Sequence, residues 1–302
     1  MKVGVQLPEV ERPVRWAELR EMARSAERIG LDSVWVGDHL LYRDDGRPTR
    51  GPWEAWTQLA ALAAVTERVE LGPLVASTSF HAPAMLAKMA ATVDEISGGR
   101  LILGLGAGWN RPDYDAFGFP YDHRVSRFAE AFEIVRRLLA DGRCDFHGTY
   151  YDVDDARLLP PGPRPGGPPL MVGSIGERML SLTLPHVAAW NAWFAWFGNS
   201  VEGYRAVRDQ VDAACRAVGR DPAELERTVA LLVAFPGAVG RQAGDRDEPD
   251  VEPIGGDPDS LVPALRGFAA EGIGHVQLVL DPITTESIEA LAPTIAAFRE
   301  GG

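Results

Sequence analysis

The chain of 302 residues carries a formal net charge of -13, with 46% hydrophobic and 24% charged residues. This composition is typical of a soluble globular protein, and the acidic balance excludes a surface specialised for nucleic acid or anionic membranes, which require clustered Lys and Arg. Two cysteines without a CxxC motif, and the absence of a secretory leader or a long apolar run, indicate a cytoplasmic protein without a structural zinc site or a disulfide framework.

Short apolar segments alternate along the chain with longer amphipathic ones, which is typical of strand–helix units around a parallel sheet. The predicted strands are 3–7, 33–37, 69–75, 101–105, 170–173, 188–194, 228–235 and 275–280. The predicted helices are 14–29, 54–66, 83–96, 124–140, 177–184, 202–218, 260–271 and 286–298. This alternation predicts a (βα)8 TIM barrel. A doubly wound sheet is disfavoured because no GxGxxG motif opens a helix after the first strand.

We expect one barrel domain over residues 1–302, interrupted by two irregular segments. The first, near 141–169, contains the run LLPPGPRPGGPP and shows neither helical nor strand periodicity. The second, near 236–257, is charged and rich in glycine. A proline- and glycine-rich segment such as the first is either a surface excursion or a lid over a binding site, and the sequence supports both interpretations.

Active sites of (βα)8 barrels lie at the carboxyl ends of the strands, so the residues after each apolar run are candidates for function. The second predicted strand reads VWVGDHL, which places Asp38 and His39 at this end. A histidine titrates near neutrality and exchanges protons, while an adjacent carboxylate sets its tautomer or contacts a ligand. In another setting this dipeptide would be a solvated strand end, but at the catalytic face of a barrel it predicts acid–base chemistry.

Small residues follow the third, fourth and fifth predicted strands. Ser77 follows the third and offers hydrogen bonds without acid–base function. The fourth continues as GLGAGWN, where glycine permits a flat ring or a phosphate to approach the backbone, although tight packing inside a barrel also selects glycine. The segment GSIG at 173–176 leads into a helix and offers backbone N–H groups to an anion, unless Ser174 simply caps that helix.

Aromatic residues gather at the end of the sixth predicted strand, where the chain reads WNAWFAWF. Core packing explains part of this density. A wall for a flat, conjugated cofactor or an apolar substrate explains the rest, and Trp190 and Trp193 are the predicted substrate contacts. The strand ends therefore predict an acid–base histidine, a glycine-lined approach, an anion site and aromatic walls, which suit a flavin-like cofactor.

Three stretches carry a resemblance to a known family: VWVGDHLL, KMAATVDEISGGRLILGLGAGWNRPDYDAFGFPYDH and PPLMVGSIGERMLSLTLPHVAAWNAW. Over nearly its whole length the chain resembles the bacterial luciferase-like monooxygenase superfamily, and within it the coenzyme F420-dependent oxidoreductases. The resemblance implies a (βα)8 TIM barrel with insertions, a homodimer, and a deep pocket that binds a reduced flavin or deazaflavin.

The resemblance also implies roles for residues at matching positions. Asp38 and His39 match a pair that reaches the deazaflavin ring and the substrate. A cis peptide that supports the face of the ring is implied around Leu74 and Val75. Ser77 matches a hydroxyl-bearing residue at the edge of the ring.

The resemblance implies that the backbone of the loop 173–176 binds the cofactor phosphate, and Arg178 and Arg124 are candidate assisting cations. The full set of predicted cofactor-binding residues is Leu74, Val75, Ser77, Gly106, Ala107, Gly108, Trp109, Gly173, Ser174, Ile175, Gly176 and Arg178. The chain departs from the sugar-phosphate and alcohol dehydrogenases of the family at Trp109, where they carry a glutamate. Arg111 also stands where many relatives have an acidic residue. The missing glutamate disfavours those particular substrates and leaves the proton donor open.

We therefore expect an oxidoreductase that transfers a hydride between F420 and a small organic substrate, with His39 moving the accompanying proton. The alternative within the family is an FMN-dependent monooxygenase that uses reduced flavin and O₂. Two other possibilities are a cofactor-binding protein without turnover and a metal-dependent barrel hydrolase. The residues available to such a hydrolase are Asp38, His39, His81 and His123. Their spacing lacks the clusters that metal ions need.

Overall fold

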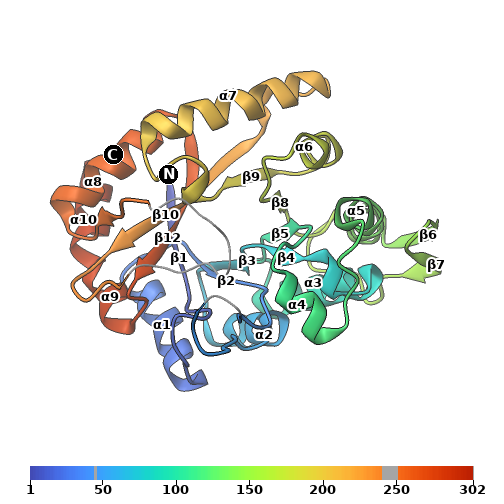
Figure 1. Cartoon of the computed structure of the whole chain (residues 1–302), viewed down its shortest axis with the longest axis horizontal. Helices are drawn as coiled ribbons and strands as arrows, with labels where there is room; N and C mark the ends of the chain where they lie inside the picture. The colour runs from blue at the N-terminus through green and yellow to red at the C-terminus, as the bar shows by residue number, and fades with distance from the viewer. Residues whose placement is uncertain (44–45, 240–250, 302) are drawn as a thin grey trace.

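The computed structural model describes residues 1–43, 46–239 and 251–301. Strands occupy the centre of the molecule and helices lie around them (Figure 1). The central strands are β1 (Lys2–Gln6), β2 (Ser33–Val36), β3 (Glu70–Pro73), β4 (Ala76–Ser77), β5 (Leu103–Gly106), β8 (Leu170–Val172), β9 (Ala189–Ala192), β10 (Glu226–Ala234), β11 (Ile254–Gly255) and β12 (Ile273–Asp281). Five of these ten strands, β2, β4, β5, β8 and β9, are buried over their whole length, as is typical of parallel strands covered by helices.

The strands form one parallel sheet in the order β3-β2-β1-β12-β10-β9-β8-β5-β4, with β11 paired to β10. A parallel bridge between Leu71 and Leu101 joins β3 to the chain before β5, so the sheet curls into a nearly closed barrel. If β3 and β4 are taken as halves of one strand and the short β11 is set aside, the described chain has eight barrel strands. The predicted (βα)8 TIM barrel is therefore confirmed.

The helices pack on the outside of the barrel. They are α1 (Trp16–Arg28), α2 (Ala55–Val65), α3 (Pro83–Ser97), α4 (Arg111–Phe117), α5 (Arg124–Asp141), α6 (Glu177–Thr183), α7 (Val201–Ala217), α8 (Pro258–Ala270), α9 (Thr285–Ala290) and α10 (Ala292–Glu300). In α1 the buried side chains include Leu19, Met22, Ala23 and Ala26, at the three- and four-residue spacing of a helix that covers a sheet. In the described ranges, no helix combines the length and the apolarity needed to cross a bilayer.

The segment 141–169 is not wholly irregular, which corrects the sequence prediction. It contains a two-stranded antiparallel hairpin of β6 (Arg143–His147) and β7 (Asp152–Arg157), which lies outside the barrel beside α5 (Figure 1). Charged residues occupy most outward positions of both strands, and only the inward side chains pack on the core. The apolar period is therefore too weak to reveal the strands. Of the other predicted irregular segment, 236–257, residues 240–250 lie outside the described residues.

Two helices also differ from the prediction. The short helix α4 follows the glycine run after β5 and begins next to Pro112, so its sequence looks like a loop. The predicted helix 286–298 divides into α9 and α10 at Leu291, because Pro293 favours the first turn of a new helix over the interior of an old one. The position of α4 matters for function because it brings a buried carboxylate to the strand ends.

Candidate active site

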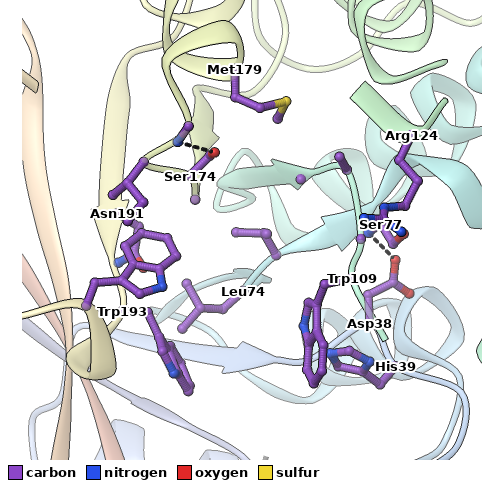
Figure 2. A pocket seen from close by; sticks show the side chains of 18 of the residues that line it. Asp38, His39, Leu74, Ser77, Trp109, Arg124, Ser174, Met179, Asn191 and Trp193 are labelled. Carbon is purple, nitrogen blue, oxygen red and sulfur yellow. Dashed lines mark hydrogen bonds between the residues drawn. The ribbon is translucent and has the colours of Figure 1, made fainter. Parts of the chain in front are cut away.

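The carboxyl ends of the barrel strands surround a cavity of about 690 Å³, a size typical of small-molecule sites. Figure 2 shows His39 and Trp109 on one wall and Trp193 on the opposite wall, with Leu74 between them. Most predicted site residues line this cavity: Asp38, His39, Leu74, Val75, Ser77, Gly106, Ala107, Gly108, Trp109, Gly173, Ser174, Ile175, Gly176 and Trp193. Of the predicted set, Arg178 and Trp190 lie outside the lining.

Asp38 follows β2 and is almost fully buried in the cavity wall. Its Oδ2 accepts the backbone N–H of Ser77 at 2.8 Å and lies 3.2 Å from Nε2 of His81. Burial raises the pKa of the Asp38 carboxyl, although His81 and the Ser77 N–H act in the opposite direction. Asp38 therefore ties the end of β2 to β4 in the cavity wall.

His39 has different partners from its neighbour in the sequence. Its Nδ1 lies 2.7 Å from Oδ2 of Asp113, a fully buried residue of α4. Burial on its own lowers the pKa of His39, but the carboxylates of Glu9, Asp113 and Asp38 outweigh this, so the pKa is raised. The imidazole at the cavity wall is therefore poised to hold a proton.

The sequence predicts that Asp38 orients His39. Among the described residues, no hydrogen bond joins these two side chains, because Asp38 is held by Ser77 and His81. Asp113 takes the orienting position instead. Adjacent residues past the end of a strand point in different directions, so each of the two finds its own partner.

Two aromatic rings enclose His39. The centroid of the Tyr42 ring is 4.9 Å from that of His39, and the Trp109 ring meets it edge to face at 5.3 Å. Trp109 occupies the cavity wall directly beside the imidazole (Figure 2). These rings fix the plane of His39 and remove part of it from water.

The glycines at the carboxyl end of β5 are required by packing against protein atoms. A Cβ built on Gly106 would lie 2.8 Å from Val75 Cγ2. One on Gly108, whose φ is +73°, would lie 2.1 Å from the Tyr114 hydroxyl and 2.4 Å from Ser77 Oγ. These positions line the cavity, but the close approach that glycine permits there is that of side chains from the segment 75–77 and from α4.

The peptide bond between Leu74 and Val75 is cis, at the place that the resemblance implies. It lies between β3 and β4, and both side chains line the cavity. The loop 173–176, which follows β8, also lines the cavity. A Cβ on Gly176 would meet only Ser174 Oγ, at 3.8 Å, so this position borders open space.

Trp190 is buried in the core and does not line the cavity, contrary to its predicted contact with substrate. As a residue in the interior of β9 it packs between strands. Its indole N–H donates to the carbonyl oxygen of Ser174 at 2.7 Å. Trp190 therefore braces the loop 173–176, while Trp193, past the end of β9, reaches the cavity.

Arg178 lies outside the main cavity, in an adjoining hollow of about 440 Å³. Its guanidinium is exposed and donates to the Ser126 hydroxyl at 3.0 Å. Arg124 lines both spaces, with its guanidinium 3.8 Å from the centroid of the Tyr121 ring. Of the two predicted cations, Arg124 reaches the cavity and Arg178 occupies its rim.

Residues 1–236 match the family described as luciferase-like monooxygenases. The chain belongs to this family. Its relatives include the F420-dependent glucose-6-phosphate dehydrogenase of Amycolatopsis mediterranei (strain U-32), which is 37% identical over 230 residues, or 72% of this chain and 65% of that protein. They also include the pyrimidine monooxygenase RutA of Caulobacter sp. (strain K31), which is 30% identical over 213 residues, or 68% of this chain and 58% of that protein.

The fold of this luciferase-like protein also matches solved structures. One is an F420-dependent secondary alcohol dehydrogenase in complex with an F420-acetone adduct, with a TM-score of 0.80, 21% identity and 99% of both chains covered. The match to the two curated relatives spans less than two thirds of their length. Both F420-dependent oxidoreductases and monooxygenases are thus relatives of this protein.

A metal-dependent hydrolase would need several of the residues Asp38, His39, His81 and His123 to bind one metal ion. In residues 1–43, 46–239 and 251–301, no group of three or more His, Cys, Asp or Glu side chains is placed to hold a metal ion. Asp38 pairs with His81 and His39 pairs with Asp113, while His123 is exposed at the start of α5. Among the described residues, the pairs Asp38–His81 and His39–Asp113 therefore do not combine into one set of metal ligands.

Two carboxylates of the site are absent from the predicted residues. Glu9 lines the cavity after β1, so it follows the same strand-end pattern as the predicted residues. Asp113 lies in α4, beyond the end of β5, and no spacing in the sequence links it to His39. Only the folded chain shows that the two meet.

Proposed function

We propose that the protein is an oxidoreductase that transfers a hydride between the deazaflavin coenzyme F420 and a small organic substrate bound in the barrel cavity. The observation that carries this proposal is the position of His39, held at the cavity wall by a buried carboxylate and facing an otherwise largely apolar space. Acid–base groups with perturbed pKa values in a cavity are typical of catalytic sites.

The residues of the cavity suit a flat ring with a phosphate-bearing tail. The cis peptide at Leu74–Val75 and the side chains of both residues would support one face of the ring. The loop 173–176, braced by Trp190, would hold the phosphate through its backbone, and Arg124, which lines the cavity, would assist it. When bound, the cofactor supplies or accepts the hydride.

His39 would give or take the proton that accompanies hydride transfer, since its imidazole borders the cavity. Asp38, buried and bonded to the Ser77 N–H, would offer the cofactor ring a polar contact in the cavity wall. Trp109 and Trp193, on opposite walls, would exclude water and favour an apolar or conjugated substrate (Figure 2).

Trp109 separates the proposed substrate from the sugar phosphates of relatives. The resemblance puts a glutamate at this position in the sugar-phosphate and alcohol dehydrogenases. An indole beside His39 offers neither a carboxylate nor a strong acceptor for a hydroxylated substrate. We propose that the substrate is less polar than a sugar phosphate.

Cofactor oxidation without oxygen tests the proposal. Reduced F420 is mixed with the protein and a panel of aldehydes, ketones and conjugated alkenes under anaerobic conditions, and the return of oxidised F420 absorbance is followed. We expect at least one compound to accelerate F420 oxidation. Oxygen consumption with reduced FMN, together with no F420 oxidation by any compound, would overturn the proposal.

The second candidate is a flavin-dependent monooxygenase. Trp109 favours it, because the indole replaces the carboxylate that the F420-dependent dehydrogenases of the family carry and makes the cavity more apolar. The similarity to RutA also supports it. Uptake of O₂ that depends on both reduced FMN and an organic substrate would establish this alternative.

The organisation of the protein is also a proposal. We propose a cytoplasmic homodimer in which each chain is one barrel domain. The resemblance to the family supports the dimer. Sedimentation equilibrium of the purified chain tests it, and a mass equal to one chain at all concentrations would contradict it.

A further inference from the structure

Asp113 has no role in the predictions from sequence, yet it lies at the centre of the contacts around His39. It belongs to the first turn of α4, and its side chain is fully buried. Its Oδ1 accepts the backbone N–H groups of Leu40 and Leu41 at 3.1 and 2.8 Å. Its Oδ2 lies 2.7 Å from Nδ1 of His39. One carboxylate therefore holds both the side chain of His39 and the backbone that follows it.

The neighbour of Asp113 strengthens the same connection. The Asn110 side chain donates to the carbonyl oxygen of Leu41 at 2.9 Å. Two residues at the start of α4 thus bind the strand end that carries His39. These contacts hold the ring of His39 and the backbone that follows it. A side chain that must meet a ligand in one orientation needs such positioning.

An ionised carboxylate is only an acceptor, so Nδ1 of His39 must donate the hydrogen bond to Asp113. Among the described residues, no hydrogen bond reaches Nε2. We propose that Asp113 is the positioning residue of His39: it fixes the proton on Nδ1 and leaves Nε2 as the atom that exchanges a proton in the cavity. The tautomer of a histidine is set by the bond that its other nitrogen makes.

Asp38 does not take this role, although it is adjacent to His39 in the sequence. Its Oδ2 is occupied by the Ser77 N–H and by His81. The charged groups that face His39 are Glu9 after β1, Asp38 after β2 and Asp113 in α4. Of these three, Asp113 alone forms a hydrogen bond with the ring of His39.

The tautomer is measured directly by ¹⁵N NMR of the histidine rings in the purified protein without added cofactor. The chain has six histidines, and the signals of His39 are assigned by their loss in the His39→Gln variant. Above the pH at which His39 titrates, we expect the neutral ring to carry its proton on Nδ1. A neutral ring protonated on Nε2 would overturn the proposal, and this result needs no variant of Asp113.

The Asp113→Asn variant provides the second test. Its amide oxygen still accepts the N–H groups of Leu40 and Leu41, but its NH₂ group faces Nδ1. We expect the neutral ring of His39 to switch to the Nε2–H form and its pKa to fall. The same replacement in a Ser-His-Asp triad leaves the geometry intact and holds the histidine in the wrong tautomer. An unchanged tautomer and an unchanged pKa would contradict the proposal.

Asp115→Asn is the matched control. Asp115 lies in the same helix, and its replacement by asparagine is the same change from carboxylate to amide. Among the described residues, its side chain forms only an exposed ion pair with Arg111. We expect its His39 spectrum to equal that of the unmodified protein. If Asp115→Asn changes the tautomer and the pKa of His39 as much as Asp113→Asn does, the change does not depend on the hydrogen bond to Asp113, and the proposal fails.

The catalytic consequence rests on the proposed function, whereas the NMR experiments do not. With an active substrate, Asp113→Asn should lower turnover by about 10²-fold or more, as expected for loss of an acid–base group, and should retain cofactor affinity. The pH limb assigned to His39 should move to lower pH. A loss of folded protein with an unchanged pH profile would instead indicate a purely structural carboxylate.

Discussion

Two histidines at opposite ends of the barrel show how neighbours set the charge of a ring. His39 lies past the carboxyl end of β2, and its Nδ1 meets the carboxylate of Asp113. His275 lies near the opposite end, at the start of β12, where its Nε2 is 2.7 Å from the Ser33 hydroxyl. Ser33 already accepts the indole N–H of Trp35, so its own hydrogen is available to His275. One ring donates to an anion and the other accepts from a neutral hydroxyl.

Burial opposes the charge of both rings, but their surroundings differ. Burial lowers the pKa of His275 to about 3, assisted by Lys2 and the amino terminus. Burial also lowers the pKa of His39, but the carboxylates of Glu9, Asp113 and Asp38 outweigh this effect, so the pKa is raised. The sign of the nearby charge, and not enclosure alone, therefore separates a structural histidine from one suited to proton transfer.

The largest expected effect is that of His39→Gln on turnover. Removing the acid–base group should lower the rate by about 10² to 10⁴-fold, while the cofactor still binds. Steady-state rates measure the first quantity and a fluorescence titration of the cofactor measures the second. Turnover close to that of the unmodified protein would remove His39 from the mechanism.

His275→Ala tests the other half of the comparison. It would leave a cavity beside Trp35 and an unsatisfied Ser33 hydroxyl, so the free energy of unfolding should fall by about 2 to 4 kcal/mol. Turnover per folded molecule should persist, because His275 lies near the start of β12 and does not line the cavity. Urea denaturation and rate measurements separate the two quantities. A strong loss of turnover at unchanged stability would contradict the structural role.

The pH dependence of stability should have opposite signs for the two rings. The folded pKa of His275, about 3, lies below the ordinary 6.5, so its contribution is present above pH 6.5 and is lost as the pH falls toward 3. The pKa of His39 is raised above 6.5, so its contribution is present below pH 6.5 and is lost as the pH rises through the folded pKa. Urea denaturation from about pH 4 to about pH 9, comparing His275→Gln and His39→Gln with the unmodified protein, measures both differences. Differences of the same sign would refute the comparison.

The smallest expected effect is that of Asp115→Asn on stability. Its ion pair with Arg111 is exposed, so the free energy of unfolding should change by less than about 0.5 kcal/mol. Urea denaturation checks this value. A change above about 1 kcal/mol would show that α4 depends on its surface charges as well as on Asp113.

The barrel could be predicted because its strands are buried on both faces and appear as continuous apolar runs between amphipathic helices. The same rule located His39, since strand ends form the catalytic face. The hairpin β6–β7 escaped detection because its strands are short, carry many charges and contain a register shift near Cys144. Helix α4 escaped because it is short and has a proline in its first turn.

The partners of the site residues could not be predicted, because they depend on packing. Nothing in the sequence distinguishes Asp113, which binds His39, from the exposed Asp115. Trp190 and Trp193 belong to one aromatic cluster, yet only Trp193 reaches the cavity. Trp190 lies within β9 and packs in the core, whereas Trp193, three residues later, lies past the strand end. Hydrophobic periodicity alone does not show at which residue the strand ends.

The central claim is that the cavity beside His39 binds a deazaflavin, and an equilibrium titration tests it most directly. F420 and, separately, FMN are added to the purified protein while ligand and tryptophan fluorescence are followed. We expect F420 to bind with a dissociation constant of about 1 μM or below and FMN to bind much more weakly. Tighter binding of FMN, or no binding of either cofactor, would contradict the proposed function.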